Sequence, residues 1–389
     1  MHPTELEESV SKVNSLKERL CGQWVGKDET IRLLVLSLVA GEHLLIVGPP
    51  GTAKSALVRS LAEGLSARYF EYLLTRFSEP SELLGPIDIG AFREGFFRRK
   101  TEQMLPDAEV VFLDELFKAS SAILNSLLGL LGERQVLIGA ERLRCPLLSL
   151  FAASNEIPAD DDLTALLDRF LLRVRTDNLP SFQFSLLVEK GLLFEKQKLS
   201  GIDHRPDLAS PVGVQDILRL RQALAAGLVF SDDFLQKYQT LVGQIRGEGV
   251  FLSDRRLIKL LKLMQVSALL SGRRQAEVPD LFVLKHTWNS VQQAELLTNL
   301  VDPVLREYTP RQASENTKEL ELLLEELARL QTALQRAGEL SDMQLFAKLR
   351  ALGELRYALW QHEGQAAQEA LRKLDSLLDS LLTQTPLLL

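Results

Sequence analysis

The chain has 389 residues, of which 46% are hydrophobic and 25% are charged, and its formal net charge is −7. This length exceeds what one ordinary core holds and predicts two or three globular domains. The acidic balance argues against a nucleic-acid-binding protein whose whole surface is basic, although a local basic patch stays compatible with it.

The cysteines and histidines point to no metal or disulfide chemistry. Cys21 and Cys145 are far apart and form no CxxC pattern, and the five histidines show no metal-ligand spacing. We therefore expect a reducing compartment. The first twenty residues are charged and amphipathic, and the apolar runs stop short of the roughly 18 residues that span a bilayer. These features predict a cytoplasmic protein with no membrane span.

The first half of the chain alternates short apolar segments with amphipathic ones. Helices are expected at 4–20, 28–40, 55–65 and 119–134, and strands at 43–48, 69–74, 110–115, 147–154 and 170–176. Strands that alternate with helices predict crossover units, and hence an α/β fold with a parallel sheet covered on both faces.

The middle of the chain changes character at a Gly/Pro-rich stretch, residues 201–213, which we interpret as a linker. Only helices are expected after it, at 214–225, 231–246, 254–271 and 279–299. Residues 301–310, with Pro303 and Pro310, then indicate a second boundary.

The C-terminal region is rich in leucine. An a/d seam runs through Leu320, Leu323, Leu327, Leu330 and Leu334. Ser341 and Gln344 form a candidate capping box for the next helix. Short connections favour an antiparallel three-helix bundle, whose leucines either fill its interior or present a docking face for a partner. The predicted domains are thus 1–200, 201–300 and 301–389.

The stretch GPPGTAKS, residues 48–55, lies between a predicted strand and a predicted helix, which is the setting of a phosphate-binding (Walker A) loop. Such a loop directs backbone N–H groups at the phosphates, with a lysine for the β- and γ-phosphates and a hydroxyl for Mg²⁺. Lys54 and Ser55 occupy those two positions. Ala53 replaces the usual glycine; its methyl is tolerable there if φ stays negative, and its amide can still donate. The predicted nucleotide contacts are Gly48, Pro49, Pro50, Gly51, Thr52, Ala53, Lys54 and Ser55.

Polar side chains end two later strands. VVFLDE, residues 110–115, finishes in Asp114, expected to hold Mg²⁺ largely through water together with Ser55, and in Glu115, expected to orient or deprotonate the attacking water. Asn155 follows the strand LLSLFAAS and could hydrogen-bond the γ-phosphate or the water, although a loop asparagine is more often a turn former. Together with the loop, these residues predict nucleotide hydrolysis.

In these motifs and their order the chain resembles the AAA+ ATPases, in particular the MoxR family and its regulatory-ATPase-variant (RavA) branch. The resemblance runs from about residue 20 to about residue 295 and also rests on FEYLLTRFSEPSELLGP, LLDRF and LSDRR. It implies an AAA+ P-loop parallel-sheet core with a helical lid, ATPase activity with ATP/ADP and Mg²⁺, and ATP bound between core and lid. Val25 and Gly26 match the stretch that lines the adenine.

The resemblance also implies roles for four polar residues. Asn155 resembles the sensor-1 residue, and Arg169 resembles the arginine finger that reaches the nucleotide of the neighbouring subunit. Arg255 resembles the sensor-2 arginine, with Arg256 as the alternative. A finger of this kind implies a homo-oligomer, by family analogy a hexameric ring.

Two insertions match this group of ATPases, and both are expected to form hairpins. They are residues 86–105, with a turn at Glu94 and Gly95, and residues 135–145. The resemblance implies that such loops face the central pore or the client. The alternative is that their aromatic and basic side chains pack on their own domain: Phe92, Arg93, Phe96, Phe97, Arg98 and Arg99.

The resemblance implies chaperone-like remodelling or maturation of a client protein, with a von Willebrand factor A domain protein as partner. Helicases carry the same two insertions, so a nucleic-acid-stimulated motor is the competing interpretation. The acidic composition and the lack of a recognisable DNA-binding domain count against it. A nucleotide-gated scaffold is a third interpretation, against which Glu115 argues.

Overall fold

The structure is a computed structural model that describes residues 3–139, 141–158, 160, 163–180, 183–199, 212–227, 229–308, 317–334, 342–360 and 365–384. The chain divides into two compact units. One comprises Met1–Asn178 and Asp203–Tyr308, and the other Leu179–Ile202 and Thr309–Leu389. Within the described ranges, none of the helices combines the length and apolar character that a membrane crossing requires.

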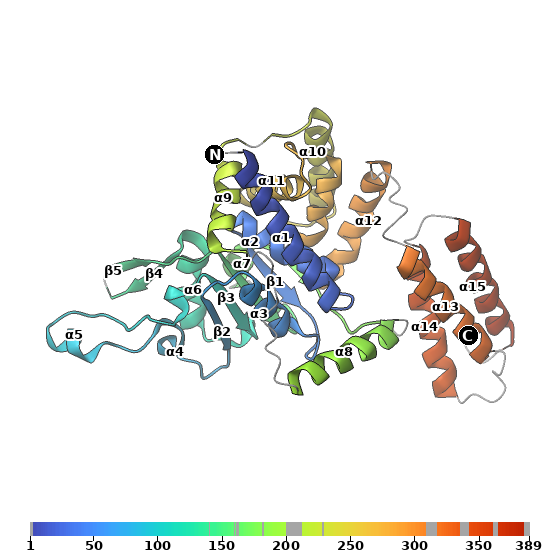
Figure 1. The fold of residues 1–389 in the computed structure, drawn as a ribbon, viewed down its shortest axis with the longest axis horizontal. Helices are drawn as coiled ribbons and strands as arrows, with labels where there is room; N and C mark the ends of the chain where they lie inside the picture. The colour runs from blue at the N-terminus through green and yellow to red at the C-terminus, as the bar shows by residue number, and fades with distance from the viewer. Residues whose placement is uncertain are drawn as a thin grey trace. The chain divides into compact units, whose positions relative to one another are not determined.

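A five-stranded parallel sheet organises the first unit, as Figure 1 shows. Its strand order is β2-β3-β6-β1-β7, and all pairs are parallel. The central strands are apolar and buried along their length, as expected for a sheet with both faces covered. The α/β prediction is therefore confirmed. The strands are β1 (His43–Val47), β2 (Tyr69–Leu73), β3 (Val110–Asp114), β6 (Ser149–Ser154) and β7 (Phe170–Arg175).

Helices pack on the sheet in the positions that the sequence predicted. α2 (Asp28–Ala40) packs on β1 and β7, and α3 (Lys54–Gly64) packs on β2 and β3. α1 (Pro3–Gln23) packs on α2. α6 (Ser121–Glu133) leads into the second insertion. Shorter helices complete the domain: α4 (Pro80–Leu84), η1 (Leu105–Asp107), η2 (Leu116–Lys118) and α7 (Thr164–Leu167).

Both insertions form hairpins. In the first, Ile87 bridges Arg99 in antiparallel fashion, and a short helix, α5 (Ile89–Arg93), caps the tip. The second pairs β4 (Gln135–Ile138) with β5 (Glu141–Arg144). They touch each other, because a Cβ built on Gly139 would lie 3.0 Å from the Phe97 ring. Phe92 and Phe96 stay more than half exposed.

Helices follow the sheet domain within the same unit. They are α9 (Val214–Ala225), α10 (Asp232–Gly247), α11 (Asp254–Leu270), the 3-10 helix η5 (Val278–His286) and α12 (Val291–Tyr308). The predicted single helix at 279–299 is wrong. Its backbone breaks at Thr287 and Trp288, whose carbonyl oxygens accept hydrogen bonds from buried Arg256 and Arg173.

The predicted second boundary, residues 301–310, contains the division between the two compact units at Tyr308, although Pro303 itself lies inside α12. A proline there removes one helical hydrogen bond. Leu297 and Val301 of the same helix are nevertheless fully buried in the core of the first unit. Packing of this apolar face outweighs the local preference.

The second unit contains α8 (Phe184–Leu199), α13 (Thr317–Leu334), α14 (Asp342–Trp360) and α15 (Gln365–Gln384). The last three pack pairwise around a leucine core that includes Leu323, Leu327, Leu352 and Leu374. The predicted seam therefore lies inside this unit. The candidate capping box falls on Ser341, outside the described residues.

The compact units divide the chain differently from the predicted domains 1–200, 201–300 and 301–389. The last strand of the sheet ends at Arg175, and residues 179–202 after it group with the C-terminal helices. The sheet domain and the helices from α9 to α12 group together. Of the predicted linker at 201–213, residues 201–211 lie outside the described part of the chain.

Candidate active site

One edge of the sheet gathers three of the predicted site segments. The loop 48–55 follows β1, Asp114 ends β3, and Asn155 follows β6. These strands are parallel and in register, with Val47 opposite Ser154 and Leu113 opposite Ala152. Their carboxyl ends therefore meet, as in other open parallel sheets that bind ligands there.

The start of the loop is held between its two neighbouring strands. Gly48 N donates to Ser154 O at 3.0 Å, and Thr176 N donates to Val47 O at 2.8 Å. A Cβ at position 48 would lie only 1.9 Å from Thr176 O. Gly51, further along, has φ +83°. Glycine is therefore required at both positions, for close approach at Gly48 and for the left-handed turn at Gly51.

Ala53 adopts φ 63° and ψ 25°, so the condition of a negative φ is not met. Its carbonyl accepts the first helical hydrogen bond of α3, from Leu57 N at 3.0 Å. The turn from Gly51 into the helix is completed by a left-handed residue. For alanine this conformation costs about 1–2 kcal/mol. Such strain is typical of ligand-binding loops.

Lys54 is the first residue of α3, and its side chain folds over the loop. Nζ donates to Gly48 O at 2.8 Å and to Pro49 O at 2.9 Å. Burial lowers the pKa of Lys54, and the nearby carboxylates of Asp114 and Glu115 oppose that shift. The ammonium group therefore lies between the loop carbonyls and the two acids.

Glu115 is fixed by three contacts. Its backbone has φ 54°, and its N–H donates to Asp114 Oδ1 at 2.9 Å. Its Oε1 accepts from Asn155 Nδ2 at 2.8 Å and lies 3.2 Å from Lys118 Nζ. The structure thus joins the predicted base and the predicted sensor directly. Sequence reasoning missed Lys118. Its only signal in the sequence is its position three residues after Glu115.

Arg169 lies at the opposite edge of the sheet. It immediately precedes β7, whose first residue, Phe170, is opposite His43 at the start of β1. The phosphate loop begins after the other end of β1. At 3.3 Å per strand residue, the two lie on the order of 15 Å apart. The structure does not bring Arg169 to the phosphate loop of its own chain.

Arg255 lies near the same edge as Arg169. Ser253 Oγ, at the start of α11, donates to Asp168 Oδ1 at 3.0 Å, which ties this helix end to the residue before Arg169. The Arg255 end of α11 therefore lies near Arg169 and not at the phosphate loop of the same chain.

The structure distinguishes Arg255 from Arg256. Arg256 is 2% exposed and donates to Asn289 Oδ1 and Thr287 O, both at 2.9 Å. Burial lowers its pKa to about 10. Arg255 is exposed. Arg256 therefore holds the helical region on β7, and Arg255 is the arginine available to another molecule.

Val25 and Gly26 connect α1 to α2 beside the phosphate loop. Gly26 has φ +62°. The next residue, Lys27, is buried, and its Nζ donates to Thr176 Oγ1 at 2.7 Å. Because Thr176 also abuts Gly48, this connection borders the loop.

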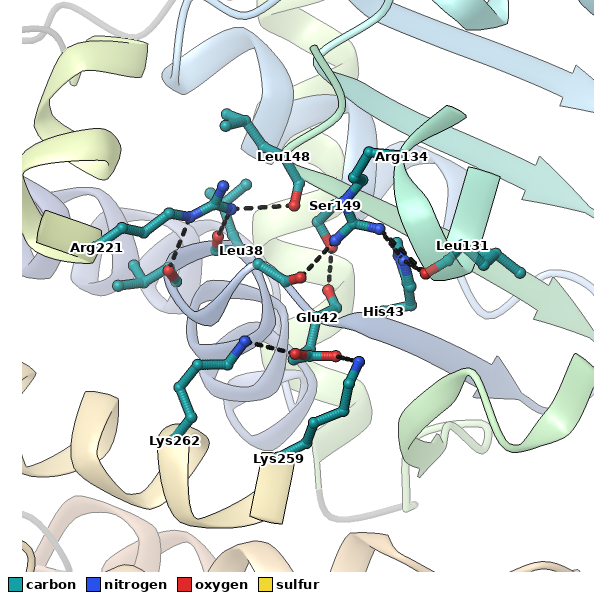
Figure 2. A network of polar contacts seen from close by, with 12 residues as sticks. Leu38, Glu42, His43, Leu131, Arg134, Leu148, Ser149, Arg221, Lys259 and Lys262 are labelled. Atoms are coloured by element: carbon teal, nitrogen blue, oxygen red, sulfur yellow. Dashed lines mark hydrogen bonds and ion pairs between the residues drawn. The ribbon is translucent and has the colours of Figure 1, made fainter. Parts of the chain in front are cut away.

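A buried polar network ties the helical region to the start of β1, as Figure 2 shows. Glu42 is 3% exposed at its side chain and forms ion pairs with Lys259 and Lys262 of α11. Its carbonyl oxygen accepts from Ser149 Oγ at 2.6 Å. Arg134, at the start of the second hairpin, donates to the neighbouring Gly41 O. Sequence reasoning missed this network.

The donor set fits Mg²⁺ bound with a nucleotide. Ser55 offers a hydroxyl and Asp114 a carboxylate, which are the hard oxygen ligands that this ion takes. The described residues hold no group of three or more His, Cys, Asp or Glu side chains able to bind a metal alone. An ion at this edge would therefore rely on phosphate oxygens and water for its other ligands.

Comparison with known proteins agrees with this geometry. A family model described as the MoxR domain in MoxR-vWA-beta-propeller ternary systems matches residues 11–210, and an AAA lid domain model matches residues 214–301. An uncharacterized protein of Methanocaldococcus jannaschii is 32% identical over 305 residues, 78% of this chain and 77% of that protein. The MoxR protein of Paracoccus denitrificans is 31% identical over 164 residues, 41% of this chain and 48% of that protein.

A crystal structure from Cytophaga hutchinsonii, described as a candidate ATPase, superposes with a TM-score of 0.61 over 79% of this chain and 97% of that chain. At 20% identity it supports the fold alone. The MoxR domain model covers more than half of the chain, and the archaeal relative covers most of it. The chain belongs to the MoxR family of AAA+ ATPases.

Proposed function

We propose that this protein hydrolyses ATP between the subunits of a ring and uses the energy to remodel or mature a client protein. One observation carries the proposal. Lys54, Asp114, Glu115 and Asn155 lie at the carboxyl edge of the sheet, whereas Arg169 lies at the amino edge. A site divided in this way is completed by the arginine of an adjacent copy in a head-to-tail ring.

Each residue of the site has a distinct role in this proposal. Lys54 and the N–H groups of residues 48–55 bind the phosphates. Glu115, positioned by Asn155, accepts a proton from water or orients it for attack on the γ-phosphate. Ser55 and Asp114 would hold Mg²⁺, which neutralises phosphate charge when bound.

The neighbouring subunit supplies the remaining positive charge. Arg169 stabilises the charge that develops on the transferred phosphoryl group, and such arginines accelerate hydrolysis by about 10³–10⁵. Arg255, exposed near the same edge, is a second cation for that interface. By family analogy we expect the ring to be a hexamer. An isolated subunit would lack the arginine of its neighbour and would be nearly inactive.

We further propose a von Willebrand factor A domain protein as partner and a cytoplasmic site of action. The description of the matching family model names MoxR–vWA–β-propeller systems, which supports this partner class. The RavA branch stays a prediction made from the sequence. The hairpin tips, with exposed Phe92 and Phe96, are the candidate client contacts.

The test is a steady-state ATPase assay on the assembled protein. Wild type should hydrolyse ATP, and Glu115→Gln should bind ATP but lose turnover by about 10²–10⁴. Addition of a co-encoded von Willebrand factor A protein should change the rate. Stimulation by DNA alone would favour the nucleic-acid motor instead. A wild-type ring that binds ATP without turnover would favour the scaffold.

A further inference from the structure

Lys27 is a buried lysine that has no role in the function proposed above. It precedes α2, and the residue is only 9% exposed. Its Nζ donates to Thr176 Oγ1 at 2.7 Å and to Asp177 O at 3.0 Å. An ammonium group has three N–H donors, so these two bonds leave one donor unused among the described residues.

Both hydrogen-bond acceptors of Lys27 are neutral, and no carboxylate of the described residues forms an ion pair with it. The Asp177 carboxylate favours the charged form of Lys27, but it pairs with Arg175, whose Nε lies 2.7 Å from Asp177 Oδ2. Buried Glu42, by contrast, has two cationic partners. A buried charge without a counter-ion is costly, and proteins rarely keep one that has no use.

The position of Lys27 places this charge at the phosphate loop. Thr176, which accepts from Lys27, also abuts Gly48, where a Cβ would lie 1.9 Å from Thr176 O. Burial lowers the pKa of Lys27; the Asp177 carboxylate opposes that shift and the positive charge of Lys54 adds to it. An anion close to both ammonium groups would favour their charged forms.

We propose that Lys27 is a second cationic contact for the phosphate chain of the bound nucleotide, acting beside Lys54. This inference rests on the proposed nucleotide site and adds a binding residue to it. The phosphate chain supplies the counter-ion that Lys27 lacks. A residue that only braced α2 against β7 would not distinguish phosphorylated from unphosphorylated ligands.

The test measures ATP, ADP and adenosine binding to the full-length protein by isothermal titration calorimetry. Lys27→Met keeps the aliphatic stem and removes the charge. We expect it to weaken ATP and ADP binding by about tenfold, since charge-assisted hydrogen bonds are the strong ones. Adenosine binding should not change. Lys373→Met, which removes an exposed lysine on α15, is the matched control and should bind all three ligands as wild type does.

Three results would overturn the inference. Unchanged affinity of Lys27→Met for ATP and ADP would do so, and so would an equal loss for adenosine. A wild-type protein that binds no nucleotide would remove both this inference and the proposed function, whereas the first two results leave the latter intact. Thermal unfolding verifies the fold, and Lys27→Gln replaces the methionine variant in the same comparison if that variant fails to fold.

Discussion

Glu42 offers the sharpest test of how the helical region is held on the sheet domain. Its carboxylate is 3% exposed and pairs with Lys259 and Lys262, which are 29% and 34% exposed. Glu42→Gln keeps the shape and removes the charge. It leaves two cations facing a neutral amide at the base of β1 (Figure 2).

The expected loss in the free energy of unfolding lies between two limits. Breaking a fully buried ion pair costs about 3–5 kcal/mol, whereas an exposed pair contributes about 0–1 kcal/mol. Here the acid is buried but both lysines reach solvent, so part of their hydration is recovered. We expect a loss of about 2 kcal/mol in the free energy of unfolding, or about 3–4 °C in Tm for a unit of this size.

The pH dependence identifies the mechanism. Burial alone would raise the pKa of Glu42, but Lys262 and Lys259 outweigh it and hold that pKa below its ordinary value of 4.5. A carboxyl whose pKa is lowered by folding stabilises the protein fully above its unfolded-state pKa. That stabilisation is lost as the pH falls below 4.5. The Tm difference between wild type and Glu42→Gln should therefore be full at pH 7 and shrink below pH 4.5.

Thermal unfolding followed by circular dichroism measures this difference. Glu102→Gln, which changes an exposed acid in the first insertion, is the control and should unfold as wild type does. Equal Tm values for Glu42→Gln and wild type at pH 7 would refute the reasoning. So would a difference that persists undiminished into acid.

Further predictions concern the loop, the C-terminal unit and the thiols. Ala53→Gly removes left-handed strain of about 1–2 kcal/mol, so calorimetry should show nucleotide binding retained, and a binding loss would contradict the strained turn. Leu352→Ala, in the core of the C-terminal unit, should destabilise that unit by about 2–5 kcal/mol. Limited proteolysis should then cut the chain faster after residue 308, whereas the ATPase rate, which reports on the first unit, should stay unchanged. Burial raises the pKa of Cys145 to about 11 and of Cys21 to about 12, so both should react with iodoacetamide at pH 8 far more slowly in the native than in the unfolded protein.

Much of the candidate site follows from local sequence because parallel strands deliver their carboxyl ends to one edge. VVFLDE and LLSLFAAS each read as a buried strand followed by polar residues, and the observed register places Asp114, Glu115 and Asn155 together. Secondary structure alone therefore predicts that these side chains converge.

Other features depend on contacts that no local pattern reveals. Glu42 meets Lys259 across 217 positions, and Lys27 meets Thr176 across 149. The break at Thr287 requires Arg256 and Arg173 as buried donors. The positive φ of Ala53 follows from the geometry of the turn, since alanine itself favours a negative value.

The central claim is that each ATP site is shared by two subunits, and a mixing experiment tests it most directly. Glu115→Gln keeps Arg169 but lacks the base, whereas Arg169→Ala keeps the base but lacks the arginine. Each variant alone should be nearly inactive in an ATPase assay. Rings assembled from both should recover part of the activity, because some interfaces then join an intact Glu115 to an intact Arg169. The absence of any recovery in confirmed mixed rings, or full activity of Arg169→Ala alone, would contradict the account.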